Sequence, residues 1–179
     1  MSIRLKVVAA IFASILMIPS VYAANGEWTT VASACVTDER SEGLYSLEQA
    51  RFEFLAGQTG QIISRCNITD PHDLFNAASP PWNTMDVTYD DPNGFNGLAA
   101  SSRVRVQLRR VHEVTGASAT LETFDSNLFP GGQQLRSHPF SHDFDFYNYA
   151  YYLTIMVDRD NIQMVPRIQR VRLWWAPVG

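Results

Sequence analysis

The run from His142 to Val157 constrains this chain most, because it is the most aromatic and β-prone stretch in the sequence. Tyrosine, threonine, isoleucine and valine favour strands over helices, and no 3.6-residue stripe is present. We expect one long central strand. Its second half, Tyr151 to Val157, is apolar on both faces and is expected to be covered on both sides. Its first half alternates aspartate with phenylalanine, which predicts one wet face.

Shorter β-prone segments follow one another along the rest of the chain, separated by turn residues. The spacing Ser46 to Gln49 matches a helical capping box, so a short helix stays open there, although the alternation of Arg51–Phe54 favours a strand. Residues 126–137 are expected to form a loop. The other expected strands are Trp28–Val36, Ile62–Ile68, Met85–Tyr89, Arg103–Val111, Ala119–Phe124 and Ile168–Trp175. About eight strands without a long helix predict an all-β fold, a single antiparallel β-sandwich of jelly-roll type.

The first 23 residues have the form of a secretory signal peptide. Arg4 and Lys6 precede an apolar segment from Val7 to Ile18, and a small-residue motif ends at Ala23. We expect cleavage after Ala23, which leaves one domain, 24–179, secreted or in the periplasm. A permanent anchor is less favoured, because 12 apolar residues fall short of the ~20 that a membrane-spanning helix needs. No stable membrane span is therefore expected after cleavage.

Cleavage makes the chain more acidic and removes its only lysine. Twelve arginines then face 18 aspartates and glutamates, a formal net charge of −6. A general nucleic-acid binder needs an excess of positive charge. The sequence therefore argues against a nucleic-acid partner.

Two cysteines, Cys35 and Cys66, remain in the chain after cleavage. An even pair in an exported chain predicts a disulfide. Alternation with Ile62 and Ile68 directs Cys66 inward, so the bridge is expected to tie the first strand to the third. Free or metal-bound thiols are the alternative, but two cysteines without a nearby histidine pair make a poor zinc site.

Tyrosines of the central stretch form the first candidate ligand surface. Tyr147, Tyr149 and Tyr151 share one face of the expected strand, where flat amphipathic rings would stack on sugars. Core packing is the alternative, and it is the commoner use of tyrosine in β-rich proteins.

Arginines form the second candidate ligand surface, because they gather on two expected strands. If these strands share a sheet face, the guanidinium groups make a patch that grips a carboxylated or sulfated polymer. A solvated face paired with acidic residues is the favoured alternative. The arginines are Arg103, Arg105, Arg109 and Arg110 on one strand and Arg167, Arg170 and Arg172 on the other.

Two groups of residues raise the question of a metal. The acidic turn with Asp90, Asp91 and Asn93 would offer oxygens to calcium, although it does not match an EF-hand and Asp-Pro-Asn-Gly is also a good turn. His138 and His142 are candidates for a transition metal, with polar residues flanking a strand as the alternative. The favoured expectation is no cofactor, with calcium kept open.

Motifs that carry catalysis are missing from the sequence. No Gly-x-Ser-x-Gly, His-Glu-x-x-His, Walker loop or Gly-x-Gly-x-x-Gly is present. Paired carboxylates for glycoside hydrolysis stay open, because a sequence does not show their separation. The enzyme question stays open, and the sequence leans towards a protein that is not an enzyme.

Five scattered segments resemble a loosely defined group of secreted bacterial β-rich proteins without assigned activity. The resemblance implies export and a β-rich fold, and it carries no site residues. The segments are Ala56–Gly60, Arg65–Thr69, Tyr89–Gly94, Thr123–Asn127 and Phe144–Tyr152.

Three functions remain in order of preference. The first is an exported non-enzymatic β-sandwich that binds a glycan or another extracellular polymer. The second is a structural or accessory subunit of an extracellular or periplasmic assembly, with exposed strand edges and the Trp174-Trp175 tail as partner surface. The third is a small metal-dependent hydrolase.

Overall fold

The computed structural model describes residues 26–70, 80–95 and 101–177. The expected signal peptide, 1–23, lies outside the described residues. Within them no α-helix occurs, and the helical turns are the short 3-10 segments η1 (Ala32–Ala34), η2 (Glu39–Ser41) and η4 (Ser126–Leu128). None of the described helices is long and apolar enough to cross a bilayer.

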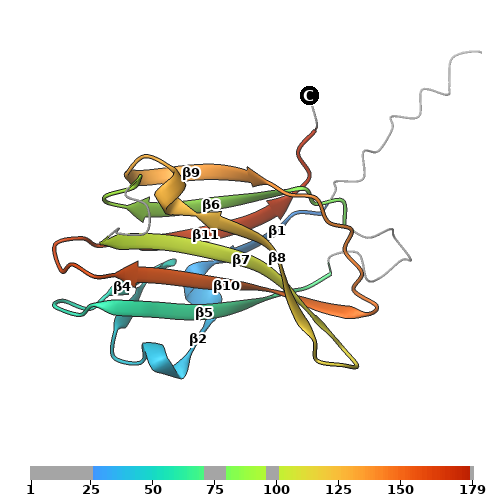
Figure 1. The fold of residues 1–179 in the computed structure, drawn as a ribbon, viewed down its shortest axis with the longest axis horizontal. Coiled ribbons are helices and arrows are strands. Elements are labelled where there is room, and N and C mark those ends of the chain that lie inside the picture. The colour runs from blue at the N-terminus through green and yellow to red at the C-terminus, as the bar shows by residue number, and fades with distance from the viewer. Residues whose placement is uncertain (1–25, 71–79, 96–100, 178–179) are drawn as a thin grey trace, which may run out of the picture.

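Two antiparallel sheets pack face to face, which confirms the predicted β-sandwich (Figure 1). One sheet has the order β2–β5–β10–β7–β8, and its strands are, in that order, Val36–Thr37, Gly60–Ile68, Tyr149–Arg159, Ser102–His112 and Ser118–Asp125. The other has the order β3–β4–β11–β6–β9, with β1 also paired to β11. Its strands are, in that order, Tyr45–Glu48, Arg51–Phe54, Arg167–Trp174, Thr84–Asp91 and Gly132–Pro139, and β1 is Trp28–Val31. Consecutive strands lie in different sheets after β1, β2, β4, β5, β6, β8, β9 and β10, as in a jelly roll.

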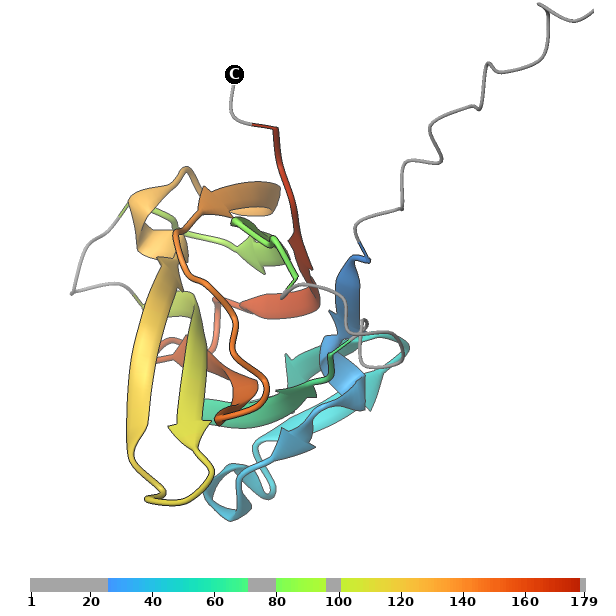
Figure 2. The same cartoon turned by 90° about the vertical axis from the view of Figure 1, so that its right-hand side faces the viewer.

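Strand β10 lies in the middle of the five-stranded sheet, so the Tyr-rich stretch does supply a central strand. The strand is shorter than predicted, because it begins at Tyr149. Residues 142–148 instead form the connection that crosses the end of the sandwich (Figure 2). Asp145 explains the difference, because its carboxylate accepts hydrogen bonds from the backbone N–H groups of Tyr147 and Asn148, each with a length of 3.1 Å. Such local bonds compete with a strand ladder.

Two other segments differ from the prediction. The predicted loop 126–137 is correct only as far as residue 131, because strand β9 starts at Gly132 and pairs with β6. The capping-box segment is a strand, β3, rather than a helix, while Arg51–Phe54 is the strand β4 that its alternation indicated. The described residues therefore hold eleven strands instead of about eight.

Alternating side chains build the core as the sequence indicates. On β7, Val104, Val106 and Leu108 are fully buried, and Met85 and Val87 of β6 are fully buried against them from the other sheet. Arg103, Arg105 and Arg109 of β7 alternate with these residues and consequently point outward, whereas Arg110 has the same parity as Leu108 and lies beside Tyr149.

The disulfide between Cys35 and Cys66 is present, with its Cα atoms 4.6 Å apart. The expected first strand is divided, because Trp28–Val31 joins the six-stranded sheet and Val36–Thr37 joins the other. Cys35 directly precedes β2, and Cys66 points inward from β5. The bridge closes a separation of 31 residues, for which the chain-entropy relation gives a stabilisation of about 3–4 kcal/mol.

Candidate functional site

The outer face of the five-stranded sheet carries polar side chains from four neighbouring strands. We call this surface the polar face. Its members alternate with buried core residues, so their position follows from strand geometry. They are Gln61, Arg65 and Asn67 of β5, Tyr152, Thr154 and Asp158 of β10, Arg103, Arg105, Gln107 and Arg109 of β7, and Thr123 and Asp125 of β8.

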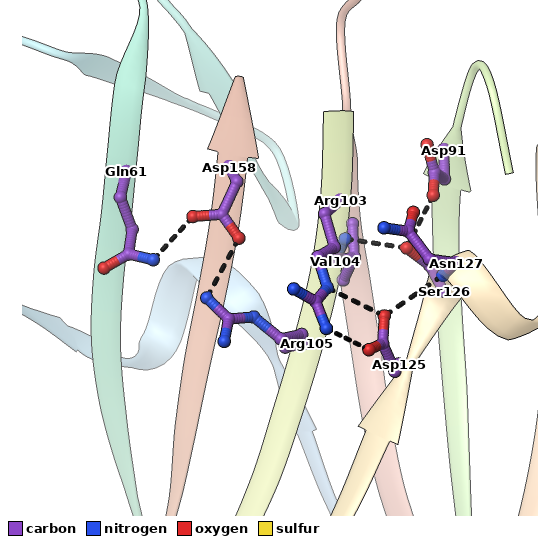
Figure 3. A network of polar contacts seen from close by, with 9 residues as sticks. All are labelled: Gln61, Asp91, Arg103, Val104, Arg105, Asp125, Ser126, Asn127 and Asp158. Carbon is purple, nitrogen blue, oxygen red and sulfur yellow. Dashed lines mark hydrogen bonds and ion pairs between the residues drawn. The ribbon is translucent and has the colours of Figure 1, made fainter. Parts of the chain in front are cut away.

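A row of paired charges crosses one end of the polar face (Figure 3). Gln61 and Arg105 both donate to the carboxylate of Asp158, the arginine over 3.1 Å. One strand further along, Arg103 binds Asp125 through two guanidinium nitrogens, Nε at 2.9 Å. The two ion pairs lie side by side on three neighbouring strands, β10, β7 and β8, and Gln61 extends the row to β5.

Partial burial holds this row in place. The four charged side chains keep only 17–26% of their surface exposed. The hydrogen bonds that Arg103 donates to Asp125 raise the pKa of Arg103 above its ordinary value, although burial opposes the shift. Since each arginine has an aspartate partner, the row presents fixed N–H donors and carboxylate acceptors with little net charge.

The centre of the polar face holds a ring and a buried hydroxyl. The Arg109 guanidinium lies 5.7 Å from the centroid of the Tyr152 ring, within cation–π range. Thr154 is 5% exposed although it points away from the core, and its Oγ1 has no hydrogen-bond partner in the described part of the chain. From Arg105 to Arg109 the strand advances about 13 Å, so the ring and the charged row are separated by the length of a few sugar units.

A cavity of about 390 Å³ lies beside the β5 edge of this face. It is lined by Val36 and Thr37 of β2, by residues 65–67 of β5, and by Thr30 and Ala34. Arg65 is fixed at its wall by Asp38, 3.0 Å away. The hydrogen bonds from the Arg40 backbone and the Arg65 side chain lower the pKa of Asp38 below its ordinary value.

The expected calcium turn is instead the end of strand β6. Asp90 and Asp91 are adjacent in that strand, so their side chains point to opposite faces. Asp91 is fully buried and accepts hydrogen bonds from Ser102 Oγ at 2.7 Å, Ser126 Oγ at 2.6 Å and the Asn93 N–H at 3.4 Å. These hydrogen bonds of Asp91 lie beneath the charged row (Figure 3), and they connect the starts of β7 and η4 to β6.

The two candidate metal histidines bind separate partners. His138 Nε2 lies 3.0 Å from Glu122 Oε1, and His142 Nε2 lies 3.0 Å from the Tyr151 hydroxyl. No cluster of three or more potential metal-ligating side chains, whether histidine, cysteine, aspartate or glutamate, occurs in residues 26–70, 80–95 and 101–177.

The tyrosines do not form the predicted platform. Tyr151 is 2% exposed and belongs to the core, whereas Tyr147 is 88% exposed on the turn before β10. Tyr149 lies between them at the end of the sheet, with the Arg110 guanidinium 4.3 Å from its ring centroid. The short turn at 146–148 breaks the alternation that would have aligned the three rings.

The two arginine strands do not share a sheet. Strand β7 belongs to the five-stranded sheet and β11 to the other, so no common patch forms. On β11, Arg172 binds the buried Asp86 and stacks 4.7 Å from the Trp174 ring centroid. Arg170 is exposed and makes no ion pair within the described residues.

Sequence reasoning missed Gln61, Asp125, Asp158 and Thr154 as members of the site. Thr154 had a signal, because it alternates with Leu153 and Ile155 and therefore faces outward. The aspartates had none, since each meets its arginine from another strand and only the sheet order brings them together.

No protein-family model matches the chain. No curated protein matches it either. The resemblance to secreted bacterial proteins therefore stays a prediction.

Three solved structures are similar over 86% of this chain. The CBM36-1 domain of a multidomain xylanase from the hindgut metagenome of Trinervitermes trinervoides has a TM-score of 0.46 at 14% identity, with all of that domain covered. A family two carbohydrate esterase from Cellvibrio japonicus has 0.39 at 13%, with 36% of its chain covered. A family 11 carbohydrate-binding module from Clostridium thermocellum, in complex with a β-1,3-1,4-mixed-linked tetrasaccharide, has 0.41 at 7%, with 90% covered. Since every TM-score is below 0.5, the sandwich assignment rests on the sheet pairing above.

Proposed function

We propose that the protein is an exported, non-enzymatic binding module that holds an uncharged polysaccharide on the polar face. The predicted signal peptide and the disulfide support export. The observation that carries the binding proposal is the row of neutralised Arg–Asp pairs on the same face as Tyr152.

The charge balance favours a neutral ligand over an acidic one. A sulfated or uronic polymer would compete with Asp125 and Asp158 for guanidinium groups that are already paired. Sugar hydroxyls instead donate to carboxylates and accept from N–H groups at the same time, so they fit a row in which both are fixed. The Tyr152 ring adds an apolar surface for a sugar ring.

The arrangement fits binding better than hydrolysis. Both aspartates of the row already accept hydrogen bonds from arginines, whereas a glycosidase needs a carboxylic acid that donates its proton to the leaving group.

Affinity electrophoresis in gels that contain soluble neutral or anionic polysaccharides tests this proposal. We expect retardation in at least one neutral gel, at least ten-fold weaker binding for Arg105→Ala, and no release of reducing ends. Arg170→Ala is the matched control, because it removes an exposed arginine from the opposite sheet. Retardation only by anionic polymers, or equal losses in both variants, would overturn the proposal. Binding to no polysaccharide would favour the assembly subunit.

A further inference from the structure

A second cavity, of about 300 Å³, opens at the end of the sandwich where the connection between β9 and β10 begins. One wall is the segment 80–83 that leads into β6, and the other is 140–143. The Phe140 N–H donates a hydrogen bond of 2.8 Å to the Asn83 carbonyl, and this bond joins the two walls. The Asn83 side chain in turn exchanges two hydrogen bonds with the backbone of Ala176, at 2.8 and 2.9 Å. The cavity therefore has a fixed shape.

The hydrogen bonds behind the cavity favour one neutral tautomer of His142. The Tyr151 oxygen accepts a hydrogen bond from the Asp145 N–H at 2.9 Å. Its own proton can therefore be donated to His142 Nε2, which lies 3.0 Å away. Nε2 then acts as an acceptor, and the neutral ring carries its hydrogen on Nδ1. Burial and the nearby Arg110 lower the pKa of His142, which agrees with a neutral ring.

Three kinds of group consequently meet at this cavity. The Nδ1–H of His142 is a donor that makes no hydrogen bond within the described residues. Asp143 and Ser141 are exposed at the rim, where the carboxylate accepts hydrogen bonds. Phe140 supplies a partly exposed aromatic wall, and the buried Trp82 packs at the base of the cavity. A donor, a carboxylate and aromatic carbon together match a polyhydroxylated ring with one apolar face.

We propose that this cavity binds a single pyranose residue, with His142 Nδ1–H donating to a hydroxyl oxygen and Asp143 accepting from neighbouring hydroxyls. The volume lies at the lower end of the range for small-molecule sites, which are about 300–1,000 Å³, and it therefore suits one ring rather than a chain. The site is separate from the polar face and does not depend on its function, so it would take a chain end or a branch residue.

Chemical-shift mapping of the purified protein with methyl glycosides of glucose, galactose, mannose, xylose and N-acetylglucosamine tests the proposal. We expect at least one glycoside to shift residues 80–83 and 140–143 at millimolar concentration. His142→Gln keeps an acceptor for the Tyr151 hydroxyl but lacks the Nδ1 donor, so we expect at least ten-fold weaker binding with the remaining spectrum unchanged. Asp143→Ala, which changes only an exposed side chain, is expected to weaken binding as well.

Two controls separate this site from the polar face. Asp160→Ala removes an exposed aspartate elsewhere and Arg105→Ala removes a polar-face residue, and both are expected to bind the glycoside like the unmodified protein. The proposal is overturned if no glycoside shifts these residues, or if Asp143→Ala and His142→Gln bind normally. Either result leaves polysaccharide binding by the polar face unaffected, so the two proposals fail separately.

Discussion

Arg103 and Arg105 each pair with the aspartate that lies opposite the other. In the strand register, Asp158 of β10 faces Arg103, and Asp125 of β8 faces Arg105. The ion pairs are nevertheless Arg103–Asp125 and Arg105–Asp158, so both bonds run diagonally across the sheet. This crossed arrangement links three strands and leaves each aspartate with a second arginine within reach.

Removal of one arginine is consequently expected to cost little stability. In Arg105→Ala, Asp158 can pair with Arg103 directly opposite, and partly exposed ion pairs contribute at most about 1 kcal/mol. We predict that urea unfolding shows a loss below about 1 kcal/mol. A much larger loss would mean that the crossed pairs do not exchange partners, and that reduced sugar binding by this variant reflects unfolding.

Thr154→Val is predicted to stabilise the protein. The Thr154 hydroxyl is buried and lacks a partner among the described residues, and such a group costs about 1–3 kcal/mol. Valine keeps the shape and removes the polar atom, so we expect a gain of about 1 kcal/mol in urea unfolding. Thr88→Val, on the outer face of the other sheet, is the control and should change stability by less than about 0.5 kcal/mol. Destabilisation by Thr154→Val would show that the hydroxyl is satisfied in solution.

Removal of an arginine from the outer face of the six-stranded sheet is expected to cost more stability than Arg105→Ala does. Arg172→Ala removes the ion-pair partner of the Asp86 carboxylate, and Asp86 is only 3% exposed. Burial raises the pKa of Asp86, but the neighbouring side chains of Ser137, Arg172 and Trp174 outweigh it and leave the pKa below its ordinary value. Loss of one partner of a buried pair costs about 3–5 kcal/mol, and a thermal melt measures this directly. Arg170→Ala should melt like the unmodified protein, and equal melting of Arg172→Ala would contradict the buried pair.

Acid is predicted to weaken the fold through His142. Burial and Arg110 lower its pKa in the folded state, and Asp143 only partly offsets them. Below about pH 6.5 the unfolded chain therefore binds a proton that the folded protein resists, and the unfolding free energy falls. His142→Gln lacks this titration, so its stability should depend less on pH between about 7.5 and 5. Parallel curves for the two proteins would contradict the neutral ring between Tyr151 and the cavity.

The sequence predicts the inner layers of this fold well, because they follow simple alternation. Met85, Val87 and Tyr89 point inward as predicted, and β10 is central as its apolar run indicated. Strand β9 was not predicted, because its sequence Gln-Gln-Leu-Arg-Ser-His-Pro is mostly polar. It lies at a sheet edge, where pairing with β6 rather than apolar burial defines it. The predicted start of the central strand failed because Asp145 closes a turn on its own backbone.

The candidate site was less predictable than the fold. Arg103 and Arg105 stood out in the sequence, and their outward direction followed from Val104 and Val106. Whether they carried free charge depended on Asp125 and Asp158, which other strands bring beside them. The sequence of one strand does not show which strands lie beside it in the sheet. A patch of free arginines for acidic polymers and a row of neutralised Arg–Asp pairs therefore could not be distinguished from the sequence.

Chemical-shift mapping with an oligosaccharide, prepared from the neutral polysaccharide that retards the protein most, tests the central claim directly. The account predicts the largest shifts at Arg105, Tyr152, Thr154 and Asp158 on the outer face of the five-stranded sheet. Shifts confined to Arg170, Arg172 and Trp174 on the opposite sheet would contradict it.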